Sequence, residues 1–226
     1  TGYIKLNRFA ASTADEFRDA VQKLQKKGMK QLILDLQSNG GGYLNIAIDL
    51  ADEFLADDKL IVYTEGSKQR REDAKSSKTG LFENGRLVIL VDEASASASE
   101  IVSGAVQDWD RGVIIGRRTF GKGLVQKPIP LPDGSMIRLT VSRYYTPTGR
   151  CIQKPYENGD KALYNRELIE RYNRGELTNA DSIHFPDSMK YSTLITKRDV
   201  YGGGGIMPDV FVPVDTTRYT DYHRNL

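Results

Sequence analysis

The sequence holds a single cysteine and only two histidines among its 226 residues. One cysteine permits neither an internal disulfide nor a cysteine metal cluster, so Cys151 does not indicate a redox compartment. Two histidines without a cysteine or a tight carboxylate cluster beside them make a poor zinc site. These shortages exclude a disulfide-stabilised fold and argue against metal catalysis.

The net charge is small, and long apolar runs are absent from the sequence. The 32 basic and 30 acidic residues nearly cancel, and no basic block is interleaved with aromatics, so nothing indicates nucleic-acid binding. No apolar run reaches about 18 residues, the length that predicts a membrane-spanning helix. The chain opens at TGYIKLNRF without a signal-like segment, which is typical of a fragment or a processed protein.

Apolar runs and helical patterns alternate in the first half of the chain. QLILDL and RLVILV are short, continuously apolar runs that predict buried strands, and ASEIVSGAVQDW has apolar residues at helical spacing. This alternation predicts an α/β domain with a mostly parallel sheet covered by helices. The second half, from GVIIG onward, is rich in strand patterns and predicts additional antiparallel strands.

The chain is expected to form one domain over residues 1–226. Residues 154–200 interrupt the strand pattern with a charged helix candidate and polar connections. So long a polar stretch is uncommon inside a compact domain, which predicts a surface insertion peripheral to the chemistry.

Three serines at alternate positions follow the apolar run RLVILV, in the stretch SASASE at 95–100. A serine nucleophile needs a base. His184 in the polar segment and His223 near the C-terminus are both interpreted as surface residues. The remaining way to activate a serine is a lysine that burial keeps neutral.

Lys122 is the candidate for such a base. It lies between Gly121 and Gly123, with Phe120 and Leu124 close by in the sequence. Glycines let neighbouring backbone approach closely, and apolar neighbours that exclude water favour the neutral amine. The same pattern also fits a solvated hairpin turn or an anion contact.

An oxyanion hole needs two backbone N–H groups directed at one point. If a helix begins near Ala98, its N–H is free, as first-turn N–H groups are. The NGGG turn after the strand QLILDL is a candidate for the second donor, although it is equally a plain strand-to-helix turn.

Four stretches together resemble one protease family. LILDLQSNGGGYL, ASASASEIVSGAVQDWDRGVIIGRRTFGKGLVQ, IRLTVSRYYTPTGRCIQ and GGIMPDVFV have the order and spacing seen in the carboxy-terminal processing (tail-specific) proteases. The resemblance covers residues 1–153 and 201–214. It implies a serine endopeptidase with a Ser-Lys dyad, on a ClpP/crotonase-like spiral of ββα units with additional antiparallel strands.

The resemblance also implies individual site residues. In the family the nucleophile lies 25 residues before the motif lysine and a glutamine follows the lysine by four, offsets that select Ser97, Lys122 and Gln126. The oxyanion donors carry over as the N–H groups of Ala98 and Gly41. The chain departs from the family at Gly40, where proline is common, and at Gln37, where arginine is common.

Further expectations follow from the same resemblance. No cofactor or metal is required, and the substrates are polypeptides, exported or partly unfolded proteins cleaved near their C-termini. The location is the periplasm or cell envelope, and a homo-oligomer is compatible with the family. Full-length members carry a PDZ domain before the catalytic core, and this chain contains none. Two alternatives are a catalytically silent peptide-binding or scaffold domain and a crotonase-type acyl-CoA enzyme.

Overall fold

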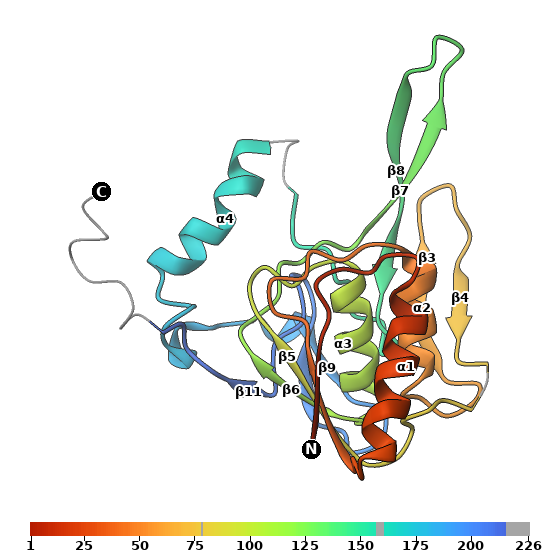
Figure 1. Ribbon diagram of the computed structural model, residues 1–226. Coiled ribbons are helices and arrows are strands. Elements are labelled where there is room, and N and C mark those ends of the chain that lie inside the picture. Colours follow the sequence, from red (N-terminus) through yellow and green to blue (C-terminus); the bar gives the residue numbers. More distant parts are fainter. Residues whose placement is uncertain (78, 157–160, 216–226) are drawn as a thin grey trace, which may run out of the picture.

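The computed structural model describes residues 1–77, 79–156 and 161–215 (Figure 1). Its elements run in the order β1 Gly2–Lys5, α1 Thr13–Lys26, β2 Gln31–Asp35, α2 Leu44–Asp52, β3 Leu60–Glu65, β4 Glu72–Lys75, β5 Arg86–Val91, α3 Ala98–Asp108, β6 Val113–Gly116, β7 Leu124–Pro130, β8 Met136–Tyr145, α4 Lys161–Asn173, the 3-10 helices η1 Ala180–Ser182 and η2 Asp187–Met189, β9 Lys190–Ser192, β10 Asp199–Tyr201 and β11 Val210–Phe211. Within these ranges no helix combines the length and apolar character that crossing a membrane requires.

A five-stranded sheet has the order β1-β2-β5-β6-β11, and every neighbouring pair in it is parallel. The apolar runs predicted as strands form its centre, with Leu32, Leu34, Leu87 and Ile89 buried. A parallel sheet needs crossover connections, which the intervening helices supply. The predicted mixed α/β class with a mostly parallel sheet is confirmed.

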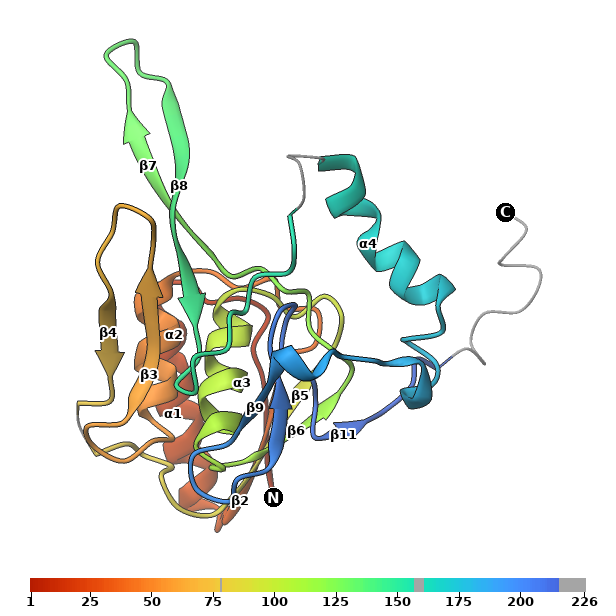
Figure 2. The same cartoon turned by 180° about the vertical axis from the view of Figure 1, so that it is seen from behind.

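A second sheet, antiparallel, has the order β4-β3-β8-β7. It confirms the additional antiparallel strands, and β9 and β10 form a further antiparallel pair. The outer half of the β7–β8 hairpin projects beyond the body of the domain (Figures 1 and 2). Its large apolar side chains are exposed, namely Ile129, Leu131, Met136, Ile137 and Leu139.

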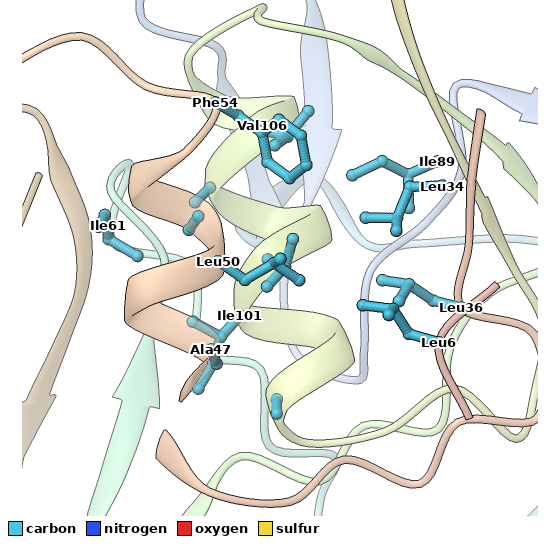
Figure 3. Packing of buried hydrophobic residues seen from close by; sticks show 14 of the residues in the cluster. Leu6, Leu34, Leu36, Ala47, Leu50, Phe54, Ile61, Ile89, Ile101 and Val106 are labelled. Atoms are coloured by element: carbon cyan, nitrogen blue, oxygen red, sulfur yellow. The ribbon is translucent and has the colours of Figure 1, made fainter. Parts of the chain in front are cut away.

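The core lies around α2 and α3. Figure 3 shows Leu34 and Ile89 of the parallel sheet on one side of these helices and Ile61 of β3 on the other. Leu50 and Val106 from the two helices are fully buried between them. Each such side chain stabilises the fold by roughly 1.5–3 kcal/mol relative to full exposure.

The sheet order brings two turns together. β2 and β5 are parallel neighbours, so the turns that follow them emerge at the same edge of the sheet. The turn after β2 carries Gly41, and the turn after β5 carries Ser97. In α/β sheets the carboxyl edge of the strands is where ligands bind.

Part of the segment predicted as a surface insertion is buried. Lys154, Arg171, Glu176 and Thr193 are among its buried residues. Charged side chains tolerate burial when they are paired and hydrogen-bonded, and here they pair with one another and with backbone groups. A polar sequence therefore did not mean an exposed segment.

One loop of this segment is anchored on Asp110, just after α3. The carboxylate accepts hydrogen bonds from the backbone N–H groups of Ile195 and Thr196, the Thr196 hydroxyl and the Arg198 guanidinium. Burial by itself raises the pKa of Asp110, but the hydrogen bonds from Thr196 and Arg198 outweigh it and lower the pKa to about 2. The ionised carboxylate thus ties the loop to the core.

Asp110→Asn should destabilise the protein near neutral pH by about 1 kcal/mol, allowing for solvent screening. A lowered pKa means that the carboxylate contributes stability above the pKa of the unfolded chain and loses it as pH falls through about 2. The difference in unfolding free energy between wild type and variant should therefore be constant from pH 7 to about 4 and shrink below it. Urea unfolding as a function of pH measures this. Asp19→Asn, at an exposed position on α1, is the control, and a pH-independent gap for Asp110→Asn would contradict the assignment.

Candidate active site

The three serines of SASASE have different environments. Ser95 is fully buried, and its hydroxyl donates to the Leu36 carbonyl (2.8 Å) and accepts from the Asp92 N–H (2.9 Å). Ser99 is also fully buried, and its hydroxyl donates to the Asn39 carbonyl (2.9 Å). Ser97 alone of the three is partly exposed. The two buried hydroxyls hold the turns together, and Ser97 is the member of the three that solvent reaches.

Ser97 sits at the N-cap of α3 with φ 57° and ψ −110°. A non-glycine residue with positive φ is strained, and such strain is typical of turns that present a functional side chain. Gly41 packs directly against this turn. A Cβ at position 41 would lie 2.8 Å from the Ser97 Cβ and 3.0 Å from the Ala98 nitrogen, so the close approach requires glycine.

Glu100 connects the Ser97 turn to the loop that carries Lys122. The carboxylate is fully buried and accepts from the N–H groups of Ser97 (2.7 Å), Gly121 (2.6 Å) and Lys122 (2.9 Å), and from the Thr119 hydroxyl (2.6 Å). Burial raises the pKa of Glu100, and the four hydrogen bonds oppose that rise. Because Ser97 and Lys122 donate to the same oxygen, their backbones are held side by side.

The side chains of Lys122 and Gln126 differ from the expectation. Both are exposed, and among the described residues neither side chain has a hydrogen bond or ion pair. Gly121 and Gly123, on either side of Lys122, pack against Lys154 and Gln153. The Lys122 side chain itself is exposed, so the apolar residues near it in the sequence do not enclose its amine. Gln126 lies in β7 at a register shift, opposite Thr140.

The two predicted oxyanion donors also differ from each other. In the described ranges the Ala98 N–H donates to no acceptor, as a first-turn N–H is expected to. The Gly41 N–H, however, donates to the Asn39 side-chain oxygen at 2.9 Å. Asn39 is fully buried, and its amide also donates to the Leu6 carbonyl. A second donor at Gly41 therefore requires that the Asn39 bond be broken or shared.

Sequence reasoning missed three residues that shape the site, Asn39, Glu100 and Gln153. Asn before glycine favours turns in which its side chain bonds a nearby backbone N–H. Ser97 and Glu100 have the spacing of a capping box, the signal that would have found Glu100. No local pattern identifies Gln153, whose buried oxygen accepts from the Gly123 N–H (2.9 Å).

Other candidates play no part in this arrangement. His184 is exposed, as expected, and His223 lies outside the described residues. In the ranges that the structure covers, no three His, Cys, Asp or Glu side chains are grouped to hold a metal ion.

A cavity of about 920 Å³ adjoins the loop after Lys122. It reaches from Leu124 and Gln153 to Tyr156 and Tyr191, between the antiparallel sheet and the segment after residue 154. The volume lies in the range of ligand-binding clefts. It is large enough to hold several side chains of a polypeptide.

The sequence profile of peptidase family S41 matches residues 1–159. The carboxyl-terminal-processing protease of Picosynechococcus sp. is 42% identical over 153 residues, 68% of this chain and 36% of that protein. The carboxy-terminal-processing protease of Bartonella bacilliformis is 39% identical over 186 residues, 80% of this chain and 42% of that protein. The solved photosystem II D1 C-terminal processing protease is 38% identical with a TM-score of 0.62, over 67% of this chain and 39% of that chain.

These similarities place the chain among the peptidases. It belongs to peptidase family S41, and it is similar to proteases that process carboxyl termini. The chain spans 36% to 42% of the length of these two curated relatives. A lipoprotein of Streptococcus agalactiae, only 16% identical, has a similar fold over 99% of this chain with a TM-score of 0.58, so the shared fold extends beyond residue 159.

Glu100→Gln should destabilise the domain by about 2–3 kcal/mol, because a buried donor without an acceptor loses its solvation uncompensated. Each carboxylate oxygen accepts two of the four hydrogen bonds, so the amide NH₂ of glutamine faces two donors whichever way it turns. Chemical denaturation measures the loss, and Glu16→Gln on the exposed face of α1 is the control. Equal stability of the Glu100 variant and wild type would show that the carboxylate does not hold these turns.

Proposed function

We propose that this chain is the catalytic core of a serine endopeptidase that uses a Ser-Lys dyad. Ser97 is the nucleophile, Lys122 the general base and acid, and the N–H groups of Ala98 and Gly41 stabilise the oxyanion. Gln126 orients Lys122 once substrate is bound. No metal or cofactor takes part in this mechanism.

The observation that carries the proposal is the position of Ser97. It is the partly exposed member of three serines, lies on a strained turn at the start of α3, and shares one Glu100 oxygen with Lys122 through backbone N–H groups. A strained turn that lifts a serine to the start of a helix also places it beside free first-turn N–H groups. This arrangement supports acyl transfer.

In the first half of the reaction, the Ser97 hydroxyl attacks the scissile carbonyl while neutral Lys122 accepts the hydroxyl proton. The carbonyl oxygen becomes an oxyanion, which the Ala98 N–H stabilises, with Gly41 as second donor when Asn39 releases it. Lys122 then gives its proton to the leaving amine. The C–N bond breaks, and an acyl-enzyme on Ser97 remains.

In the second half, Lys122 takes a proton from water, and the resulting hydroxide attacks the acyl carbonyl. The Ser97–acyl bond breaks, and the proton returns to the Ser97 oxygen, so that one peptide bond and one water yield a carboxylic acid and an amine. Because the Lys122 side chain is exposed, the proposal requires that bound polypeptide cover it and remove its water.

The substrate and setting are inferred from the relatives. Proteins that resemble this chain are named for processing carboxyl termini, which supports cleavage near the C-termini of exported or partly unfolded polypeptides. The same family resemblance supports a place in the periplasm or cell envelope and a spiral, ClpP/crotonase-like variant of the fold. The cavity beside Leu124 is the proposed site for substrate side chains.

Ser97→Ala and Ser95→Ala should have opposite effects. Ser97→Ala removes the nucleophile and should lower kcat by at least about 10³-fold while the melting temperature stays near that of wild type. Ser95→Ala deletes buried hydrogen bonds and should cost about 1–3 kcal/mol of stability, yet retain measurable peptidase activity. Mass spectrometry of an unfolded protein substrate together with thermal melting reports both effects. Loss of activity in both variants, with unchanged melting temperatures, would contradict the assignment of Ser97 as the nucleophile.

Lys122→Arg should abolish peptide cleavage while peptide binding persists, because a guanidinium keeps the charge but does not deprotonate in proteins. Wild-type kcat/KM should rise with pH, since only the neutral amine accepts the serine proton. Lys127→Arg, at an exposed position on β7, is the matched control and should behave as wild type. Cleavage by Lys122→Arg at the wild-type rate would refute the dyad.

The same assays separate the rival functions. A catalytically silent peptide-binding domain would bind peptides without cleaving them in the wild-type form. A crotonase-type enzyme would bind coenzyme A, which isothermal titration calorimetry detects directly.

A further inference from the structure

The loop Arg118–Gly123, which carries Lys122, is held from two sides. On one side the buried Glu100 carboxylate accepts from the N–H groups of Gly121 and Lys122. On the other side the Arg171 guanidinium of α4 donates to the carbonyl oxygens of Arg118 (2.7 Å) and Thr119 (3.1 Å). Among the described residues no other group donates to these two carbonyls. An anion thus holds the amide side of the loop and a cation holds the carbonyl side.

Arg171 is built into this position. Its side chain is 1% exposed, although it comes from a segment whose sequence is largely polar. The third guanidinium nitrogen, Nε, donates to the Glu176 carboxylate at 2.8 Å, so each of the three nitrogens has an acceptor. A planar guanidinium with all its nitrogens engaged fixes both its own orientation and that of the carbonyls it contacts.

Glu176 joins Arg171 to Arg118 in the same loop. Its carboxylate accepts from the Arg118 guanidinium at 2.6 Å and 2.9 Å as well as from Arg171. Burial raises the pKa of Glu176, but the two guanidinium groups outweigh it and hold that pKa below its ordinary value. The Arg118 side chain also donates to the Gly204 carbonyl, which ties the network to the chain after β10.

Lys154 makes a second connection between the segment and the loop. Its backbone N–H donates to the Gly121 carbonyl at 2.9 Å. Its ammonium is buried over the rings of Phe120 and Tyr164, 4.1 Å and 4.2 Å from the centroids, and lies 3.1 Å from the Glu167 carboxylate. Phe120, the residue before Gly121, is therefore also held through its side chain.

We propose that α4 and the residues up to Glu176 brace the catalytic loop, with Arg171 as a positioning residue for Lys122. The proposal rests on the proposed function of Lys122 as the base. Arg171 and Glu176 lie outside residues 1–159, the part of the chain that matches the family profile. Two residues outside the family pattern therefore help to position the Lys122 loop of this protein.

The physical reason is the lack of side-chain contacts at Lys122. Among the described residues no hydrogen bond or ion pair holds its amine. The position of the Lys122 side chain is therefore set by the backbone of the loop. Without Arg171 the carbonyls of Arg118 and Thr119 lose their donor. Within the described ranges these two peptide groups are then held only through the N–H groups of Thr119 and Phe120, which donate to the carbonyls of Ile206 and Ser95. A displacement of about 1 Å between reacting groups is enough to cost about 100-fold in rate.

Arg171→Met tests the brace, with Arg166→Met on the exposed face of the same helix as the matched control. For Arg171→Met we expect kcat to fall about 10- to 100-fold with KM little changed, and the pH at which kcat/KM reaches half its maximum to move. Arg166→Met should match wild type in all three. A loss in kcat by one constant factor at every pH, or no loss, would overturn the positioning role, because a smaller folded fraction alone leaves the pH profile in place.

Hydrogen exchange makes the test independent of peptidase activity. The Gly121 and Lys122 amides should exchange faster in Arg171→Met than in wild type and in Arg166→Met. If wild type cleaves no peptide, the proposed function fails, and faster exchange still supports the brace. Unchanged exchange overturns the brace whatever the activity. Should Arg171→Met not fold, Glu176→Gln, which keeps shape and removes the charge between the two arginines, replaces it with the same expectations.

Discussion

The carboxylate of Glu100 is the contact on which the geometry of the site depends. A buried charge is costly unless it is fully hydrogen-bonded, and here four donors from two separate turns supply those bonds. The turns can satisfy the carboxylate only when they lie together, so its burial and their arrangement require each other. Ser97 and Lys122 are far apart in the sequence and belong to different turns. Their shared acceptor turns two independent loops into one rigid unit.

Around Glu100, each charged side chain that contacts the Lys122 loop faces the peptide atoms of opposite polarity. Backbone N–H groups of the Lys122 loop face an anion, and carbonyl groups of the same loop face the cation of Arg171. The carboxylate thus stabilises the positive N–H ends of these peptide groups, and the guanidinium stabilises the negative carbonyl ends. The parallel sheet supplies the Ser97 turn, and the segment after residue 154 supplies Arg171, which contacts the Lys122 loop. The site is thus shared between the family core and a segment that lies outside its pattern.

Much of the architecture could be predicted from local sequence patterns. Apolar runs such as QLILDL and their alternation with helices indicated the parallel sheet, because burial on both faces of a strand leaves a continuously apolar run. The capping-box spacing of Ser97 and Glu100 was a local signal for the contact between them, although not for the Gly121 and Lys122 bonds, which come from a distant loop. Arg171 had no signal at all. Its charge suggested exposure, and only the three-dimensional position of the Arg118 and Thr119 carbonyls explains its burial.

The exposed edge strand of the β7–β8 hairpin is a surface on which other chains could aggregate. β7 forms the outer edge of its sheet, and apolar residues such as Ile129 and Leu139 are exposed on the hairpin. An open apolar edge invites strands from other molecules and is a common start of aggregation. Pro128 and Pro130 lie in this edge strand. Proline is tolerated there and has no N–H to pair with an incoming strand, so the hairpin can extend into solvent with a reduced tendency to recruit another chain.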